Sequence, residues 1–290
     1  MKILLTGSGG QLAQELEPIL LSAGEVIAGD RTFFDLSQPD SIHQLMGEIK
    51  PNLVVNCAAY TAVDKAESEP ELANAVNGIA PGILAEECEK LGATLIHIST
   101  DYVFGGSQGY PYCETDTTNP LGVYGKSKLA GELSIIKALD RHIIIRTAWV
   151  YGNGGKGNFV KTMLRLGKDR EEIRVVADQI GSPTWTGDLA AAISQITSSI
   201  RPEIFGTYHY TNSGVASWYD FAVAIFEEAK QLGFSLKVKR VIPITTPEYP
   251  TPAKRPAYSV LSSTKISAVL GSHPPHWREG LRQMLAREAR

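Results

Sequence analysis

The chain has 290 residues, of which 43% are hydrophobic and 20% charged, and its net charge is -3. This length fits one large domain with an appendage or two domains. No apolar run approaches the ~20 residues that cross a bilayer, the first apolar run is too short for a signal peptide, and Lys/Arg clusters typical of nucleic-acid binding are missing. We therefore expect a cytoplasmic protein whose partners include neither nucleic acid nor membrane. The three cysteines are widely spaced, which argues against a disulfide framework.

The first predicted element is a short buried strand at residues 3–5, followed by a glycine turn and a helix whose apolar residues begin at Leu12. In that order, backbone N–H groups and the positive helix end point to one place, where a pyrophosphate can bind. Gly7 permits the tight turn, and Gly10 lets the backbone approach the phosphates. Ala13 stands where a third glycine is common and still allows close packing. The pattern predicts a dinucleotide site.

A second predicted strand, residues 26–30, ends in an acid about 20 residues after the glycines. Asp30 can accept hydrogen bonds from the adenosine ribose and so favours NAD. Arg31 can hold the 2′-phosphate of NADP instead. The sequence therefore leaves both NADH and NADPH open. Asp35 and Leu36 follow near the expected adenine position, although Asp35 can equally cap the helix predicted around residues 42–49.

Two further buried strands are predicted at residues 53–56 and 94–98. Small side chains follow the first, ahead of Tyr60 and Thr61, and leave room for a ligand outside the sheet. Thr100 follows the second, where its hydroxyl can hydrogen-bond a substrate carbonyl. His97 alternates with apolar neighbours inside the strand, so we interpret it as a core histidine and not a catalytic one. A helix is expected between these strands, from about 71 to 91, with its continuity around Gly78 and Pro81 left open.

The segment 124–128 opens the next predicted helix and places Tyr124 and Lys128 four residues apart, on one helix face. A free phenol has a pKa near ~10, and an adjacent ammonium is expected to lower it. Such a tyrosine can protonate a carbonyl oxygen as hydride reaches the carbon. Tyr-x-x-x-Lys is weak evidence alone, but the glycine turn and Thr100 supply the context of a reductase.

After a buried strand at residues 142–146, the alternation of strands and helices loosens. Trp149 fits either the core or a cover over a ligand. A helix at 186–198, a strand at 206–210 and a helix at 218–232 capped by Ser217 are predicted. The proline-rich stretch 249–256 is expected to be a stiff loop, in which Arg255 either reaches a diphosphate or lies in a surface linker.

These elements predict an α/β fold. Residues 1–150 are expected to form a Rossmann-type domain with a doubly wound parallel sheet that binds NAD(P). Residues 151–290 are expected to form a smaller C-terminal substrate-binding region, from which some strands can return to the main sheet.

With these motifs in hand, the chain resembles the extended short-chain dehydrogenase/reductases and, within them, the dTDP-4-dehydrorhamnose reductases. The resemblance covers essentially the whole length. Several of the matching segments are specific to the reductases. The segments are residues 7–12, 56–67, 99–104, 119–126, 146–151, 178–184 and 251–256.

The resemblance implies hydride transfer from NADPH or NADH to C4 of a dTDP-sugar, dTDP-4-dehydro-L-rhamnose. It implies that Tyr124 is the proton donor, that Lys128 binds the nicotinamide ribose and assists Tyr124, and that Thr100 contacts the sugar. Asp101 and Trp149 match positions near the sugar nucleotide. The matched cofactor positions are Gly10, Gln11, Leu12, Asp30, Asp35, Leu36, Ala59, Tyr60 and Thr61.

Some members carry a glutamate-bound Mg²⁺ at a dimer contact. Glu15 matches one such glutamate, but Asp188 or Gly187 stands near the second, so the resemblance leaves both the Mg²⁺ ion and a homodimer open. Three other classes of protein have similar chains. A 4,6-dehydratase typically needs a glutamate after the Asp that follows Thr100, and Tyr102 stands there. A 4-epimerase uses the same Thr/Tyr/Lys set, and the regulatory subunit of methionine adenosyltransferase has a similar chain without catalysis.

Overall fold

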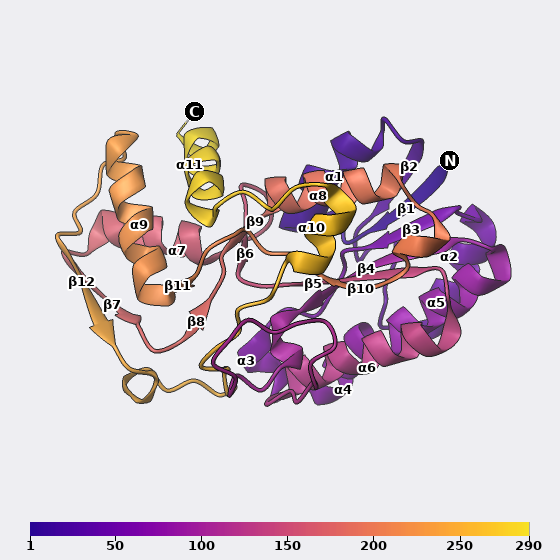
Figure 1. Ribbon diagram of the computed structural model, residues 1–290, viewed down its shortest axis with the longest axis horizontal. Coiled ribbons are helices and arrows are strands. Elements are labelled where there is room, and N and C mark those ends of the chain that lie inside the picture. Colours follow the sequence, from indigo (N-terminus) through magenta and orange to yellow (C-terminus); the bar gives the residue numbers. More distant parts are fainter. Residues whose placement is uncertain (290) are drawn as a thin grey trace.

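The computed structural model describes residues 1–289, and a parallel sheet lies at its centre (Figure 1). Within that range the sheet has six strands, and its order reverses beside the first strand, between β1 and β3. Such a reversal is the place where open α/β sheets bind ligands. In spatial order the strands are β2 (Glu25–Gly29), β1 (Lys2–Thr6), β3 (Leu53–Asn56), β4 (Thr94–Thr100), β5 (His142–Thr147) and β10 (Gly206–His209).

Helices cover both faces of this sheet, which confirms the predicted doubly wound α/β fold (Figure 1). Alternate strand residues supply the two cores, so Leu4 and Val54 face one layer while Leu5 and Val55 face the other. One layer contains α1 (Gln11–Leu20), α8 (Thr186–Ser198) and α10 (Thr264–Leu270); the other contains α2 (Pro39–Ile49), α5 (Ala80–Leu91) and α6 (Val123–Ala138). Strands buried on both faces explain the nearly unbroken apolar runs in the sequence.

The helix expected from 71 to 91 is divided. It consists of α4 (Pro70–Asn74), a π-helical turn (Ala75–Ile79) and α5, after the short α3 (Val63–Ala66). Helix α6 passes so close to this turn that a Cβ on Gly131 would lie 2.1 Å from the Asn77 carbonyl oxygen. The widened turn and the glycine together bring α6, which carries Tyr124, against the π-helical turn.

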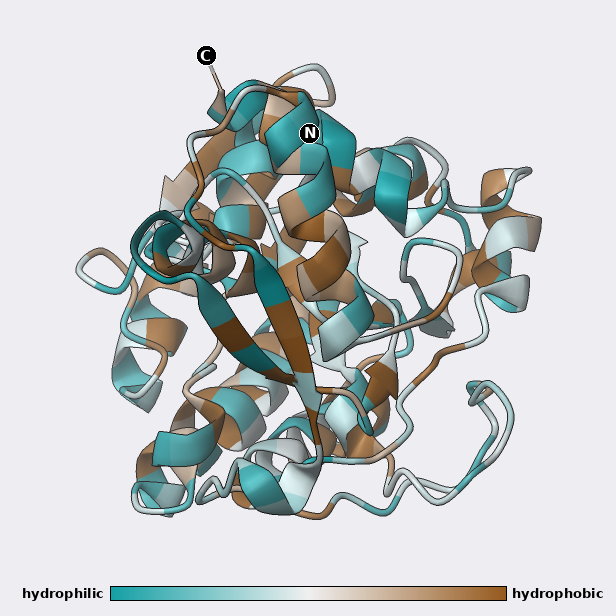
Figure 2. Ribbon diagram, turned by 90° about the vertical axis from the view of Figure 1, so that its left-hand side faces the viewer, coloured by the Kyte–Doolittle hydropathy of each residue, from teal (hydrophilic) through white to brown (hydrophobic). Residues whose placement is uncertain are grey.

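The C-terminal half of the chain contributes both to the main sheet and to a second hydrophobic core. Strand β10 and helix α8 join the main sheet and its covering layer. A second core forms around the parallel pair β7–β12, whose polar and apolar residues are visible in Figure 2. This region contains α7 (Phe159–Asp169), β7 (Glu172–Val176), α9 (Trp218–Gln231), β12 (Arg240–Ile244) and α11 (Trp277–Glu288).

Short strand pairs connect these two parts: β6 (Val150–Tyr151) with β9 (Thr184–Trp185), and β8 (Ile180–Gly181) with β11 (Ala216–Ser217). Ser217 caps α9 as predicted, in a capping box with Asp220. The stretch 249–256 contains neither helix nor strand, as expected. Among residues 1–289, every helix falls short of the length and apolarity that a membrane crossing needs.

Candidate active site

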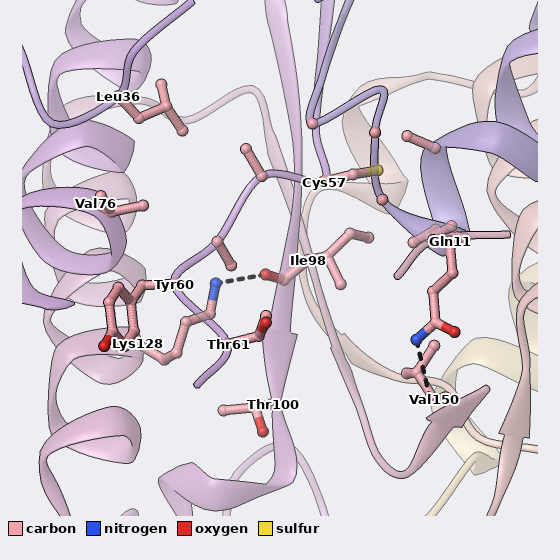
Figure 3. A pocket seen from close by; sticks show the side chains of 18 of the residues that line it. Gln11, Leu36, Cys57, Tyr60, Thr61, Val76, Ile98, Thr100, Lys128 and Val150 are labelled. Atoms are coloured by element: carbon pink, nitrogen blue, oxygen red, sulfur yellow. Dashed lines mark hydrogen bonds between the residues drawn. The ribbon is translucent and has the colours of Figure 1, made fainter. Parts of the chain in front are cut away.

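A cavity of about 830 Å³ opens at the carboxyl ends of the parallel strands, where the strand order reverses (Figure 3). Nearly all residues proposed from the sequence line it. They are Gly7, Gly10, Gln11, Leu12, Asp30, Arg31, Asp35, Leu36, Ala59, Tyr60, Thr61, Thr100, Asp101, Tyr124, Lys128 and Trp149. Arg255 is missing from this lining within residues 1–289. The volume is in the range of small-molecule sites.

The glycine turn between β1 and α1 forms one end of the cavity. Gly7 has a φ of +75°, and a Cβ there would lie 2.8 Å from the backbone nitrogen of Ala58, so glycine is required on both counts. Gly10 is the N-cap of α1, and no side chain in the described part of the chain caps this helix end. The first N–H groups of α1 therefore face the cavity with the positive end of the helix dipole, as a pyrophosphate would need. These features fit a dinucleotide.

Gln11 joins this turn to the second half of the chain. Its Nε2 donates to the Val150 carbonyl at 3.1 Å, as Figure 3 shows, and its Oε1 accepts from Asn158 Nδ2 at 3.1 Å. Residues Gly155 to Gly157, in the loop between β6 and α7, also line the cavity. The glycine turn and the loop after β6 are thus in contact, and both line the cavity.

The end of β2 carries the residues expected at the adenosine. Asp30 Oδ1 accepts hydrogen bonds from the backbone N and the hydroxyl of Thr32, at 2.9 and 2.6 Å, and these bonds lower the pKa of Asp30. Arg31 is 71% exposed and lies 3.6 Å from Asp35 Oδ2. The alternative that Asp35 caps the next helix is wrong, because Gln38 is the N-cap of α2 and Asp35 binds Ser37.

Tyr124 and Lys128 of α6 and Thr100 at the end of β4 all line the cavity. Helix α6 begins at Val123, so Tyr124 and Lys128 lie one turn apart. The ring of Tyr124 packs edge-on against Tyr102, with 5.6 Å between ring centroids. Lys128 Nζ is 1% exposed and donates to the Ile98 carbonyl at 2.7 Å, a bond drawn in Figure 3.

The pKa values of this group depart from the expectation that Lys128 would lower that of the phenol. Burial raises the pKa of Tyr124 to about 12, although hydrogen bonding to Thr100 opposes the rise. Burial also lowers the pKa of Lys128 to about 8. Tyr124 is therefore protonated at neutral pH, as a proton donor must be, because desolvation outweighs any attraction to the ammonium.

Known proteins are similar to this chain in sequence and in fold. The RmlD substrate binding domain model matches residues 1–290. A dTDP-4-dehydrorhamnose reductase from Aggregatibacter actinomycetemcomitans is 44% identical over 98% of each chain. The chain belongs to the dTDP-4-dehydrorhamnose reductase family.

Solved structures of family members have the same architecture. The crystal structure of a dTDP-4-dehydrorhamnose reductase from Clostridium acetobutylicum is similar with a TM-score of 0.93, at 42% identity, and covers 100% of both chains. A second one, from Bacillus anthracis, is in complex with NADP; its TM-score is 0.91, at 39% identity over 99% of each chain. The enzyme class of the family, a pyridine-nucleotide oxidoreductase, agrees with the site geometry.

Asp101, beside Thr100, is buried and incompletely bonded. Its Oδ1 accepts from the Thr100 hydroxyl at 3.0 Å, while its Oδ2 has no hydrogen-bond partner among residues 1–289. Burial raises the pKa of Asp101 to about 6, although the nearby hydroxyls of Ser259 and Thr100 oppose the rise. Asp101 lines the cavity, so this oxygen can accept a hydrogen bond from a donor that binds there.

The raised pKa of Asp101 predicts a pH-dependent stability. Between the unfolded pKa of 3.8 and the folded pKa of about 6, the native state binds more protons, so stability falls as pH rises through this window. Asp101→Asn removes the effect. We expect the difference in unfolding free energy, wild type minus variant, to fall by about 2.4 kcal/mol between pH 4 and pH 7. Urea denaturation across this range measures it, and a constant difference would contradict the prediction.

Trp149 is packed against other residues at the edge of the cavity. Its backbone φ is +48°, and its ring stacks on Trp218 with 3.5 Å between centroids. A Cβ on Gly181 would lie 2.6 Å from Trp149 Cε2, so the backbone of Gly181 also packs closely against the indole. The same residue lines the cavity. The expectation that Trp149 covers a ligand stays a prediction.

Arg255 is held by a partner from the first half of the chain. Its Nη2 lies 2.8 Å from Asp64 Oδ2, and its Nη1 donates to the Thr251 hydroxyl. This ion pair closes the proline-rich loop onto α3. The predicted contact between Arg255 and a diphosphate stays a prediction.

Sequence reasoning missed Asn77, which lies in the π-helical turn. Its Oδ1 accepts from the backbone N of Tyr60 at 2.9 Å, and its Nδ2 donates to the Tyr60 carbonyl and the Ser127 hydroxyl. Asn77 therefore positions the Tyr60 backbone and α6 at once. The interruption of the helical pattern around Gly78 was the available signal, since π-helical turns are frequent at functional sites.

Glu15, the candidate ligand for Mg²⁺, is paired inside the chain. Its carboxylate accepts from Arg287 Nη1 at 2.9 and 3.2 Å. Within residues 1–289, no group of three or more His, Cys, Asp or Glu side chains is arranged to hold a metal ion. Because the Mg²⁺ alternative places the ion at a contact between two copies of the chain, it stays a prediction.

Proposed function

We propose that the protein reduces the C4 keto group of dTDP-4-dehydro-L-rhamnose, giving dTDP-L-rhamnose, with NADPH or NADH as reductant. The observation that carries the proposal is the meeting of a protonated phenol, Tyr124, with the Thr100 hydroxyl in the cavity that begins at the glycine turn. The name of the relatives at 42–44% identity and the NADP bound to the Bacillus anthracis protein support it.

Each residue of the site has a role in the proposed reaction that follows from its chemistry. The reduced cofactor supplies the hydride. Tyr124 donates its proton to the ketone oxygen, and the Thr100 hydroxyl turns from Asp101 to donate a hydrogen bond to the same oxygen. Gly7 and Gly10 let the backbone approach the pyrophosphate, while Lys128 binds the nicotinamide ribose. Asp101 and Trp149 are proposed to contact the sugar nucleotide.

Three further points belong to the proposal. The proposed boundary between a cofactor domain and a substrate region lies near residue 150, because β1 to β5 precede it and the β7–β12 pair follows, while β10 and α8 return to the main sheet. The protein is placed in the cytoplasm, and a homodimer is compatible with the proposal. The substrate is a dTDP-sugar.

The test is a spectrophotometric assay at 340 nm with a panel of 4-keto-6-deoxy sugar nucleotides and either NADPH or NADH. We expect stoichiometric oxidation of the reduced cofactor with the dTDP-linked ketone. A 4-epimerase would interconvert sugar nucleotides without net oxidation of added cofactor, and a non-catalytic regulatory subunit would oxidise none. Either result would overturn the proposal.

A further inference from the structure

A row of polar side chains crosses the sheet beneath the cavity and ends at Lys128. Thr6, Asn56 and His97 occupy directly paired positions on β1, β3 and β4, so their side chains lie side by side on the face that α6 covers. All three are at most 1% exposed. Thr6 Oγ1 donates to Asn56 Oδ1 at 2.7 Å, Asn56 Nδ2 lies 3.0 Å from His97 Nδ1, and His97 Nε2 lies 3.1 Å from Lys128 Nζ.

The hydrogen bonds of Asn56 determine the tautomer of His97. Backbone N–H groups can only donate, and the Ala58 N–H donates to Asn56 Oδ1 at 3.2 Å. The oxygen of the amide is therefore on the Thr6 side, and its NH₂ group faces His97. Because that NH₂ group is a donor, His97 Nδ1 must accept. Burial lowers the pKa of His97 well below its usual value, so the ring is neutral and its one proton is on Nε2.

The Nε2–H of His97 points at Lys128 and needs an acceptor there. An ammonium has three donors and no acceptor, whereas a neutral amine has a lone pair. The amine can accept from His97 and still donate to the Ile98 carbonyl. The other ionisable groups acting on Lys128 are Glu132 of the same helix, which Arg146 of β5 binds, and the Cys57 thiol after β3.

We propose that His97 is a positioning residue for the reduction: Asn56 fixes its tautomer, and its Nε2–H favours Lys128 as the neutral amine. The role of Lys128 in turnover rests on the proposed function. There, the Tyr124 proton passes to the ketone oxygen, and the resulting phenolate is restored by a proton that originates on the Lys128 ammonium. His97 makes Lys128 a stronger acid, since it stabilises the amine that this transfer leaves.

The test is the titration of Lys128 Nζ by ¹⁵N NMR in the full chain without cofactor or substrate, assigned with Lys128→Met. Wild type is expected to titrate near the pKa of about 8. In Asn56→Asp the carboxylate can keep the bonds from Thr6 and Ala58 and accept from His97 Nδ1–H. Nε2 then becomes an acceptor for the ammonium. We expect the pKa of Lys128 to rise by about one unit or more.

A new carboxylate also attracts the ammonium through space, so the matched control is Asn56→Asp combined with His97→Leu. If His97 transmits the effect, Asn56→Asp shifts the pKa less in the His97→Leu background, and His97→Leu alone raises it. Equal shifts in both backgrounds, or an unchanged pKa in His97→Leu, would overturn the proposal. These readouts need no turnover, so a failed reductase assay would count against the proposed function alone. In an active enzyme, the pH profile of kcat/KM is expected to shift in the same direction.

Discussion

Tyr124→Phe is expected to lower kcat for ketone reduction by about 10²-fold or more, the usual contribution of a general acid. Phenylalanine keeps the ring that packs edge-on against Tyr102, so the fold and the shape of the cavity are retained. What disappears is the O–H group that is protonated at neutral pH and hydrogen-bonded to Thr100. Initial rates at saturating substrate, together with the dissociation constant of NADPH from fluorescence titration, separate chemistry from binding.

The matched control is Tyr110→Phe, which removes a phenol that is 64% exposed and outside the cavity lining. This variant is expected to keep the wild-type kcat. The dissociation constant of NADPH is expected to change little in Tyr124→Phe. Wild-type turnover in Tyr124→Phe would remove Tyr124 from the mechanism, and equal losses in both variants would point to an effect other than proton donation.

The elements around the site were predictable because their signals are local. Residues 3–5 are apolar and lead directly into glycines, and β1 and Gly7 follow from that pattern alone. The four-residue spacing of Tyr124 and Lys128 likewise places both on one side of α6. Short-range rules suffice where backbone geometry and helix periodicity decide the outcome.

Contacts between distant segments were not predictable in this way. Arg255 pairs with Asp64, 191 residues away, and the loop composition alone left its partner open. The pKa of Tyr124 is raised by burial, which depends on segments far apart in the chain. The neighbouring Lys128 alone predicted a lowered pKa, and that prediction was wrong. His97 was correctly interpreted as a core residue, yet its contact with Lys128 depends on the register of three strands and the position of α6.

Glu132→Ala is expected to destabilise the protein by about 3–5 kcal/mol, because it leaves the guanidinium of Arg146 buried without its carboxylate. The two side chains are 1% and 7% exposed, and Arg146 Nη2 lies 2.6 Å from Glu132 Oε2. Glu132 also accepts from the Ser99 hydroxyl, so it joins α6 to both β4 and β5. The helix that carries Tyr124 and Lys128 is thus fixed to the sheet by this pair, and urea denaturation measures its loss.

The control for Glu132→Ala is Glu172→Ala, which breaks the pair with Arg240 between β7 and β12. Both partners there are at least half exposed, so the loss is expected to stay within about 1 kcal/mol. The double variant Glu132→Ala with Arg146→Met removes both charges. It is expected to be less destabilising than Glu132→Ala alone, because the unpaired buried guanidinium is the main cost. A Glu132→Ala loss as small as that of Glu172→Ala would show that Arg146 finds water or another acceptor, and that α6 is held in place mainly by its apolar contacts.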